Sequence, residues 1–579
     1  MKTRSKFQAC KKAGRAPAFS FSQQARGHVR GQVSAMGMSH GPFSIYVFYL
    51  YTSRTATRRF PVAPWGTRQS AGRRGRLSPE PATAHRRAAM TSTHLYTLHD
   101  LFVRHWPHLV FVVSVVSGAA AAIHAAMNKS DVRAAIAWVG VILMSPIFGP
   151  LLYLVAGINR VRRDRISQQR DSSLRDYTNQ KAIPVADVAE DSGSQFMSLR
   201  TLGDRISNFP LLDNNHIRIL NGGDEAYPAM LHAIRNARRT IGLQTYIFDD
   251  DRTGREFVDA LADAHARGVE IRVLIDAVGS KYSRPPIIRL LRKKGITAAL
   301  FMTNPLGMKM PYANLRSHRK ILIVDGRHGF TGGMNIREGF VSAIAGRDVA
   351  GDTHFQIEGP AVLQLTSVFA HDWKFTTHEA LPYAEWCSDE LKHVPQPSVP
   401  ARCVRSGPDR FINSTHNMLL GAFAVAQRHI RIQSPYFLPD QILLGALNTA
   451  ARRGIQVDVV IPGHNNLRLV DYAMTAQLDQ IIRNGCRVWR ASGNFNHSKL
   501  ITIDGGWSYV GSSNMDPRSL RLNFELDIEI YSHELAAQIE QMIDSEIERA
   551  DPCSLAQLAA LPFRKRLRNK IIWLASPYL

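Results

Sequence analysis

The chain has 579 residues, of which 45% are hydrophobic and 21% are charged, and its formal net charge is +25. This composition supports a large packed core and excludes a wholly disordered chain. The five cysteines are widely spaced and form no CxxC pair, which argues against a disulfide scaffold and against a zinc site of that type.

The N-terminal tail, residues 1–89, carries most of the excess positive charge. It holds 17 lysines and arginines against a single acidic residue, Glu80, and sustains no helical or strand period. Three interpretations stay open: a disordered basic arm, an Arg-rich targeting segment, or an extension upstream of a start at Met90. We favour the extension because membrane-type sequence begins soon after Met90. The charge of the tail therefore says little about the partner of the folded part.

Two apolar runs between residues 105 and 159 predict a transmembrane hairpin. Residues 109–127 contain no formally charged side chain, and neither do residues 134–158. About 20 apolar residues cross a bilayer, and Pro146 and Pro150, which break helices in water, are tolerated in membranes. The alternative is a pair of buried core helices. It explains two adjacent runs without an amphipathic period less well than a membrane hairpin does.

The charges around the hairpin predict its orientation. The short connector, residues 128–133, holds Lys129 and Arg133, whereas arginines follow the second run at positions 160, 162, 163 and 165. The positive-inside rule then places the C-terminal part in the cytosol, in a multi-pass protein of the inner (cytoplasmic) membrane. His124 is expected at the membrane interface and not as a ligand. Residues 160–205 are polar and are expected to form a linker.

From about residue 213, alternating helical and strand patterns predict an α/β fold with a mixed sheet that is built twice. The first copy is expected to contain helices 225–238 and 254–267 and strands 240–248 and 269–276. The second is expected to contain helices 414–427 and 441–453 and strands 429–437 and 455–461. We therefore expect two α-β-α halves related by pseudo-twofold symmetry, at residues 206–390 and 391–555.

The clearest repeat is a pair of matched motifs. HRKILIVDGRHGFTGGMN begins at His318, and HSKLITIDGGWSYVGSSN begins at His497. A single HxK usually marks a solvated strand, but two sets with the same spacing indicate a functional site. The matched positions are His318, Lys320, Asp325, Gly332 and Asn335 in the first motif and His497, Lys499, Asp504, Gly511 and Asn514 in the second.

Each motif offers an imidazole, an ammonium group and an amide. HxK followed by an apolar run predicts a strand on which His318 and Lys320 point the same way, as His497 and Lys499 do. Ammonium and amide donors suit phosphate oxygens. Two imidazoles at one phosphorus supply a nucleophile and a general acid, while the lysines and asparagines stabilise charge. We expect no metal and no other cofactor, because the cationic side chains supply the electrophilic role.

A carboxylate is expected to fix the tautomer of each imidazole. Asp352 and Glu525 follow the two motifs at similar distances, and we assign Asp352 to His318 and Glu525 to His497. Two alternatives stay open. In the first, Asp352 is only a surface acid on a strand. In the second, the motif aspartates orient the histidines; if they do not, they only anchor the turn at the strand end.

The two HxKxxxxD motifs resemble those of the phospholipase D superfamily, and a membrane hairpin followed by two such halves resembles its bacterial cardiolipin synthases. The similarity spans about residues 100–579 and includes LQTYIFDDD and QSPYFLPD. It implies two phospholipase D-like halves. It also implies transfer of a phosphatidyl group between two phosphatidylglycerol molecules through a phosphohistidine, giving cardiolipin and glycerol. His318 would be the nucleophile, and His497 the general acid and later the base. The implied catalytic set is His318, Lys320, Asp325, His497, Lys499 and Asp504, with Asn335 and Asn514 at the substrate phosphate.

The C-terminal segment, residues 556–579, is basic and amphipathic. Phe563, Leu567, Ile571 and Leu574 share helical spacing among five basic side chains. This pattern predicts an interfacial helix attracted to anionic lipid, with a solvated basic tail as the alternative.

Rival functions stay open at this point. A phospholipase that gives the intermediate to water, or a transferase with another acceptor alcohol, would carry the same motifs. A nucleic-acid phosphodiesterase suits the basic tail but not the membrane runs, so we expect phosphatidylglycerol and membrane lipid as partners and no nucleic acid. A membrane-anchored phosphate-binding protein would keep the pocket without turnover.

Overall fold

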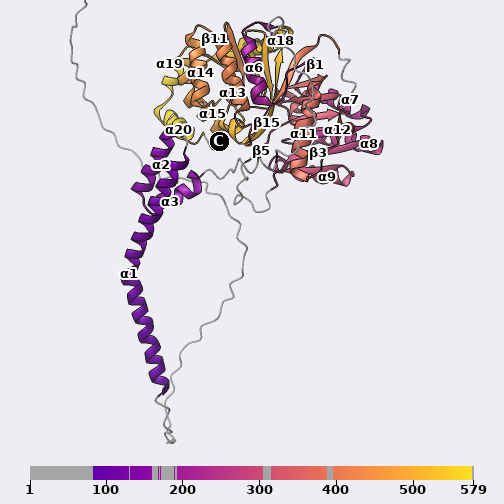
Figure 1. Ribbon diagram of the computed structural model, residues 1–579. Helices are drawn as coiled ribbons and strands as arrows, with labels where there is room; N and C mark the ends of the chain where they lie inside the picture. The colour runs from indigo at the N-terminus through magenta and orange to yellow at the C-terminus, as the bar shows by residue number, and fades with distance from the viewer. Residues whose placement is uncertain are drawn as a thin grey trace, which may run out of the picture. The chain divides into compact units, whose positions relative to one another are not determined.

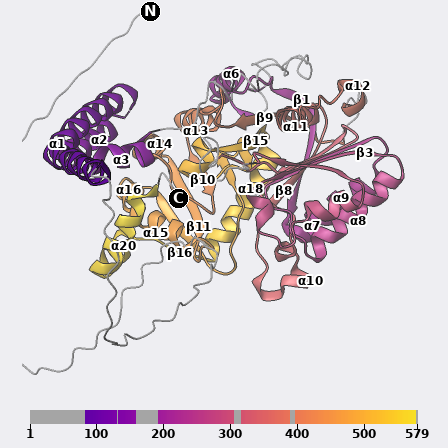
Figure 2. The ribbon, with the colours of Figure 1, turned by 90° about the horizontal axis from the view of Figure 1, so that it is seen from below.

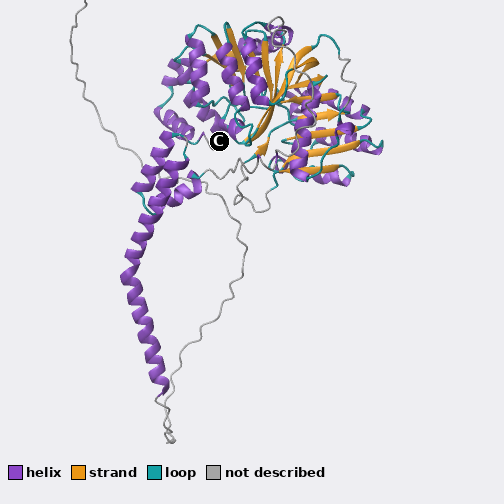
Figure 3. Ribbon diagram, in the orientation of Figure 1, coloured by secondary structure: helices purple, strands orange, loops and turns teal. Residues whose placement is uncertain are grey.

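A computed structural model describes most of the chain from residue 83 onward. From residue 192, strands lie in the middle of the fold and helices cover both faces of the sheet (Figures 1 and 3). The predictions made for residues 1–82 lie outside the described residues. The described residues are 83–129, 131–158, 167, 170, 188, 192–303, 315–387 and 395–576.

Of the predicted two-helix hairpin, only the first helix is long enough to span a membrane. α1 (Thr83–Asn128) contains an apolar stretch, Phe102–Asn128, whose length and composition suit a bilayer. The second predicted span is broken. α2 (Val132–Met144) ends at a turn, after which α3 (Phe148–Leu152) continues as the π-helix η1 (Tyr153–Gly157).

The break between α2 and α3 has a local cause. Pro146 lies in the turn, where its ring and its missing N–H prevent the helix from continuing. Gly149 then approaches α2 so closely that a Cβ at this position would lie 2.6 Å from the carbonyl oxygen of Val141. α3 therefore packs against α2 instead of extending it, and the prediction of one continuous helix over residues 134–158 was wrong.

One mixed sheet runs through the globular part of the chain, in the order β16-β12-β11-β10-β13-β14-β15-β9-β1-β8-β7-β6-β2-β3-β4, with β5 paired to β15 beside this path. The antiparallel pair β1–β9 lies at its centre. Outward from that pair, β8-β7-β6-β2-β3-β4 corresponds to β15-β14-β13-β10-β11-β12. The bounds are β1 Leu212–Asn221, β2 Thr240–Thr245, β3 Glu270–Asp276, β4 Thr297–Phe301, β5 Arg316–Ser317, β6 Ile321–Val324, β7 His328–Gly332, β8 Thr353–Glu358, β9 Val399–Ser406, β10 His429–Gln433, β11 Gln456–Pro462, β12 Arg487–Ala491, β13 Leu500–Ile503, β14 Trp507–Gly511, β15 Asn523–Tyr531 and β16 Ala550–Pro552.

The helices and strands predicted from periodicity are all present, most of them within three residues of the predicted bounds. The HxK segments are the exception, because β6 and β13 begin only after the lysine of each motif. The α-helices are α6 Phe196–Ser207, α7 Gly222–Asn236, α8 Arg252–Ala266, α9 Ile288–Lys293, α10 Ser342–Ala345, α11 Ala361–Thr377, α12 Tyr383–Trp386, α13 Ser414–Val425, α14 Gln441–Arg452, α15 Arg468–Gln477, α16 Asp479–Ile482, α17 Pro517–Arg521, α18 His533–Glu548, α19 Leu555–Ala560 and α20 Phe563–Leu574.

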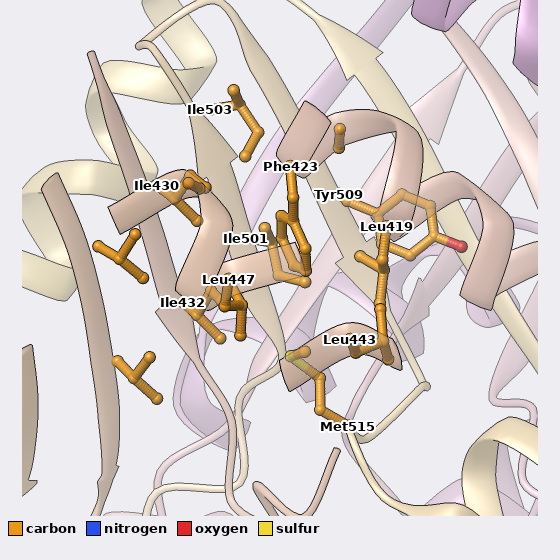
Figure 4. Packing of buried hydrophobic residues seen from close by; sticks show 14 of the residues in the cluster. Leu419, Phe423, Ile430, Ile432, Leu443, Leu447, Ile501, Ile503, Tyr509 and Met515 are labelled. Atoms are coloured by element: carbon orange, nitrogen blue, oxygen red, sulfur yellow. The ribbon is translucent and has the colours of Figure 1, made fainter. Parts of the chain in front are cut away.

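Both faces of the sheet are buried, which explains why its strands are continuous apolar runs. In β6, Ile321 and Ile323 belong to the core that includes α11, whereas Leu322 and Val324 belong to the core under α7 and α8. Figure 2 shows α11 on one side of these strands and α7, α8 and α9 on the other. In the second half, α13 and α14 pack in the same way on β10 and β13 (Figure 4).

The predicted linker, residues 160–205, ends in a packed helix. α6 buries Phe196 and Leu199 in the core of the second half and lies against α13. Farther upstream, Arg170 is also buried and pairs with Asp372 at 2.6 Å. The linker prediction was therefore wrong for these residues, since polar composition concealed an amphipathic helix and a buried arginine.

Candidate active site

His318 and His497 face one another across a cavity of about 1010 Å³ that both halves line. Their ring centroids are 6.5 Å apart and the ring planes are nearly perpendicular, at 85°. This separation leaves room for one tetrahedral phosphate between the rings. The structure therefore brings together the two residues that the repeat singled out, although they are far apart in the chain.

Each HxK segment is positioned by a strand of the other half. The His318 N–H donates to the carbonyl of Phe524 at 2.9 Å, and β5 pairs in parallel with the start of β15. The second half repeats this arrangement, because the His497 N–H donates to the carbonyl of Gly351 at 2.7 Å beside a parallel bridge between Gly351 and Asn496. Each histidine is thus anchored across the boundary between the halves.

The orienting carboxylates are exchanged relative to the sequence-based assignment. Nδ1 of His318 donates to Oε2 of Glu525 at 2.9 Å, and Nδ1 of His497 donates to Oδ2 of Asp352 at 2.9 Å. The residues were identified correctly, but their pairing was wrong, and Asp352 is buried and not a surface acid. The cross-boundary strand pairing is the cause, since it brings each histidine beside the carboxylate of the opposite half.

Because Nδ1 of each ring is hydrogen-bonded, Nε2 is the ring nitrogen that is available to a ligand in the cavity. His318 Nδ1 also lies 3.1 Å from the carbonyl oxygen of Ser512, so two acceptors fix its proton at Nδ1. His497 Nδ1 has only one such acceptor and lies 2.9 Å from Nζ of Lys499. The two imidazoles therefore differ in their surroundings, and the second has a cation against its ring.

Burial governs the charge states in the site. It lowers the pKa of His497 to about 4, with Lys499 acting in the same direction. It also lowers the pKa of His318, although Glu525 opposes this. Burial alone would raise the pKa of each carboxyl, yet Lys499 and His497 hold the pKa of Asp352 below its ordinary value, and His318 does so for Glu525. Both carboxyls are therefore ionised and able to accept from Nδ1.

The motif lysines are buried beside their histidines. Lys320 Nζ donates to the carbonyl of His318 at 2.6 Å, and Lys499 Nζ donates to the carbonyl of His497. Burial lowers the pKa of Lys320 to about 7 and that of Lys499 to about 8. Neither lysine lines the cavity, and each ammonium group lies behind its histidine, so its charge acts on an anion between the two rings through the buried interior.

The motif aspartates do not touch the reacting atoms. Asp325 accepts from the backbone N–H groups of Arg238, Arg239 and Thr240, at the start of β2, at distances of 2.8 to 3.2 Å. Neither aspartate lines the cavity, and both have a positive φ, 56° for Asp325 and 54° for Asp504. The hydrogen bonds of Asp325 are those of an anchor for the turn at the strand end.

Asp504 repeats this arrangement in the second half. It accepts from the N–H groups of Gln427, Arg428 and His429 at 2.7 to 2.9 Å, before β10. The aspartate thus fixes the strand that lies next to its own HxK strand, as in the alternative of a strand-end anchor.

The two asparagines line the cavity as expected. Asn335 accepts from the N–H of Ile247 at 3.1 Å through its Oδ1, which turns its NH₂ group away from that strand. Asn514 lies 3.4 Å from Ser519 Oγ through Nδ2, and its buried Oδ1 has no partner among the described residues. Both side chains are thus held in place with polar capacity left for a ligand.

Several residues of the site were missed by sequence reasoning. The ring of Tyr246 lies 5.3 Å from that of His318, while Tyr436 and Phe495 lie 5.9 and 5.8 Å from His497. The signal was present in LQTYIF and QSPYF, which end at the edge of the sheet where the histidines lie. Within the ranges that the structure describes, no three His, Cys, Asp or Glu side chains are grouped as metal ligands.

Comparisons with known proteins identify the family to which the chain is similar. The family model "Cardiolipin synthase, PLD-like domain" matches residues 230–373 and 419–547, and a phospholipase D-nuclease N-terminal model matches residues 119–157. The chain is 32% identical over 467 residues to cardiolipin synthase A of Pseudomonas syringae, covering 80% of this chain and 96% of that one. It is 30% identical to the cardiolipin synthase of Geobacillus thermodenitrificans, covering 77% of this chain and 88% of the relative.

Solved structures give a more distant likeness. The phosphatidylserine synthase of Haemophilus influenzae superposes with a TM-score of 0.49 at 16% sequence identity, covering 66% of this chain and 100% of that one.

Proposed function

Because this chain belongs to the cardiolipin synthases of the phospholipase D superfamily, we propose that it moves a phosphatidyl group from one phosphatidylglycerol to another, forming cardiolipin and releasing glycerol. The observation that carries the proposal is the pair of buried histidines on one cavity, each with a carboxylate at Nδ1 and a lysine beside it. Such an arrangement suits in-line substitution at a phosphodiester.

We assign the nucleophile to Nε2 of His318. Two acceptors at its Nδ1, Glu525 and the Ser512 carbonyl, raise the electron density of the ring and keep a lone pair on Nε2. At Nδ1 of His497, the ammonium group of Lys499 lies where His318 has its second acceptor, and the pKa of His497 is lowered to about 4. In the free site His497 is therefore neutral at neutral pH, and the anionic phosphate of a bound substrate favours the imidazolium, which then acts as the general acid.

The two half-reactions then balance in protons and bonds. In the first, Nε2 of His318 forms a bond to phosphorus, the bond to the glycerol oxygen breaks, and His497 gives its proton to that oxygen. In the second, a hydroxyl of the second phosphatidylglycerol gives its proton to His497 and attacks phosphorus, and the bond to His318 breaks. Water in place of that hydroxyl would give phosphatidic acid.

Four further side chains hold the phosphate in this scheme. Lys320 and Lys499 supply positive charge from behind the two histidines, and Asn335 and Asn514 supply amide donors from the cavity wall. The correspondence of the strand orders about the β1–β9 pair supports a pseudo-twofold relation between residues 206–390 and 391–555, with the phosphate close to the axis.

The long apolar helix supports anchoring in a membrane, where the lipid substrate resides. The stretch Phe102–Asn128 has the length and composition of a span. We infer a two-pass arrangement in which α2, α3 and η1 together return the chain, with the catalytic part in the cytosol at the inner membrane, as the arginines after residue 158 favour.

The C-terminal helix α20 offers a second membrane contact. Its side chains Phe563, Leu567, Ile571 and Leu574 are 69%, 47%, 57% and 72% exposed and share one face. The opposite face, with the buried Asn569, packs on α15 (Figures 1 and 2). Basic residues from Arg564 to Lys570 flank the apolar stripe.

We therefore assign the α20 stripe to the interface of an anionic bilayer. The chain just after this helix reaches the active site, because Ser576 lines the cavity together with Leu467 and Val470. A bilayer in contact with α20 would thus lie next to one wall of the cavity.

The test of the proposed activity is incubation of the full-length protein with phosphatidylglycerol alone. We expect cardiolipin and glycerol as products, and a phosphatidyl group on His318 in digests that are denatured and kept at neutral pH, because the P–N bond is labile in acid, and then analysed by mass spectrometry. Phosphatidic acid as the main product would show a hydrolase instead. Lipid binding without any turnover would show a binding protein.

A further inference from the structure

One wall of the cavity carries an unexpected positive charge beside His318. Arg316 and Arg518 both line the cavity, the first immediately before the HxK motif and the second on α17. Neither arginine belongs to the catalytic groups assigned above. The inference drawn from them rests on the proposed transfer reaction and concerns its second substrate.

The position of Arg316 is fixed by strand register. Arg316 pairs with Asn523 where β5 meets β15, and two residues further along both segments His318 meets Glu525. Residues two apart on an extended segment point to the same side, roughly 7 Å from each other. Arg316 therefore presents its side chain to the cavity next to His318, at a distance similar to the length of a glycerol bridge between two phosphates.

The other half lacks this charge. The position two residues before His497 is Phe495, and the position two residues before Asp352 is Ala350. Both of these residues line the cavity as well. The position two residues before the histidine is thus a cation in the first half and an aromatic residue in the second, although the histidines themselves are matched.

The charge of Arg316 is not cancelled by an ion pair. Among the residues that the structure describes, no carboxylate lies within 4.0 Å of its guanidinium, which donates to the carbonyl of Leu315 at 2.6 Å. The acids in its surroundings accept from the backbone instead. Asp276 accepts from the N–H groups of Val278, Gly279 and Ser317.

Two further features support this interpretation. Asp516 accepts from the N–H of Ser519 at 2.8 Å and so caps α17, which carries Arg518. Asn523 is 5% exposed and lines the cavity, and its Oδ1 has no partner among the described residues. Its Nδ2 donates to Glu525 at 3.0 Å, which fixes the side chain. A buried, unpartnered acceptor beside a cation suits a ligand that carries both a hydroxyl group and an anionic phosphate.

We propose that Arg316 and Arg518 form the subsite for the phosphate of the acceptor lipid, and that Asn523 Oδ1 accepts from a hydroxyl of its glycerol. The acceptor differs from water and from free glycerol in one respect, namely that a phosphodiester is attached to its glycerol. A cationic subsite one glycerol length from the reacting phosphorus selects an alcohol that bears such an anion. The site thereby directs the phosphohistidine toward cardiolipin.

The proposal is tested by competition between two acceptors in one reaction. Full-length protein receives phosphatidylglycerol together with isotopically labelled glycerol. The intermediate then partitions between cardiolipin and labelled phosphatidylglycerol. The ratio of the two products does not depend on how much of the enzyme is folded or active. We expect Arg316→Gln to lower the ratio of cardiolipin to labelled phosphatidylglycerol at least tenfold, and Arg316→Lys to restore much of it.

A matched control comes from another arginine of the cavity. Arg337 already pairs with Asp249 at 3.0 Å, so Arg337→Gln should leave the product ratio unchanged. An unchanged ratio in Arg316→Gln would overturn the acceptor subsite, and so would an equal fall in Arg337→Gln. Absence of both products with the unmodified protein would instead contradict the transferase activity itself.

Discussion

Nδ1 of His318 lies 2.9 Å from a carboxylate oxygen of Glu525, a residue 207 positions further along the chain. The second histidine is held in the same way by Asp352 of the first half, 145 positions away. The histidine and its carboxylate are therefore not supplied by one motif. Each half supplies a histidine and a carboxylate that binds the histidine of the other half, so neither half alone contains a complete pair.

The crossed pairing makes Glu525 the residue that controls formation of the phosphohistidine. In Glu525→Gln the amide can donate to Nδ1, which favours a proton on Nε2 and removes the nucleophilic lone pair. We expect the rate of histidine phosphorylation to fall by roughly 10²- to 10⁴-fold. Rapid-quench measurement of phosphohistidine checks this.

The matched variant is Asp352→Asn, which acts on His497 only. Here both the formation and the breakdown of the intermediate on His318 should slow, because His497 is the general acid of the first half-reaction and the base of the second. Phosphate found on His497 in this variant would reverse the two roles.

The motif aspartates should affect stability and not chemistry. Each carboxylate accepts from at least three backbone N–H groups at the start of a strand. Asp325→Ala or Asp504→Ala leaves these donors without an acceptor, which costs roughly 2 to 3 kcal/mol. We expect a clear fall in the thermal midpoint, with kcat per folded molecule largely kept at low temperature. A loss of kcat comparable to that of His318→Ala, in protein of normal stability, would restore a catalytic role.

The lowered pKa values of Lys320 and Lys499 predict that activity falls at alkaline pH. Burial lowers the pKa of Lys320 to about 7 and that of Lys499 to about 8, so the free site loses positive charge as the pH rises through this range. The anionic substrate is then bound less well, and kcat/KM should fall between about pH 7 and pH 8. Lys320→Arg keeps its charge at alkaline pH and should shift the fall upward. A kcat/KM that stays flat well above both values would contradict this assignment.

The sequence was sufficient for the parts of the site that depend on local pattern. The spacing of His318 and Lys320 from an apolar run, repeated at His497 and Lys499, predicted the two histidines that face each other across the cavity, because period and repetition are visible in one dimension. The alternating helices and strands followed from the same periodicity. Pro146 was recognised as a helix breaker, but the effect of the membrane on it was overestimated.

The pairing of the carboxylates could not be obtained in this way. Asp352 and Glu525 follow the two motifs at similar distances, so the spacing is compatible with either partner. The choice depends on parallel pairing between strands from different halves, which is a tertiary contact. Arg316 was missed for a related reason, since only its register opposite Asn523 shows that it faces the cavity.

The exposed face of α20 should matter only when the substrate is in a bilayer. We expect the double change Leu567→Glu and Ile571→Glu to lower the rate on phosphatidylglycerol in reconstituted bilayers by about tenfold. An apolar stripe that carries negative charge no longer inserts into the bilayer. The two carboxylates also oppose the attraction of the basic residues to the anionic surface, which is worth about 1 kcal/mol for each basic residue. The rate on a short-chain phosphatidylglycerol dispersed in water should be unchanged, because the cavity is intact.

Met197→Glu is the matched control for this double change. Met197 is an exposed apolar residue of α6, and its substitution should change neither rate. Equal losses with both substrates would assign the face of α20 to folding. A change in oligomeric state on gel filtration would assign it to a second copy of the chain, because that apolar face would then be covered by protein and not by lipid.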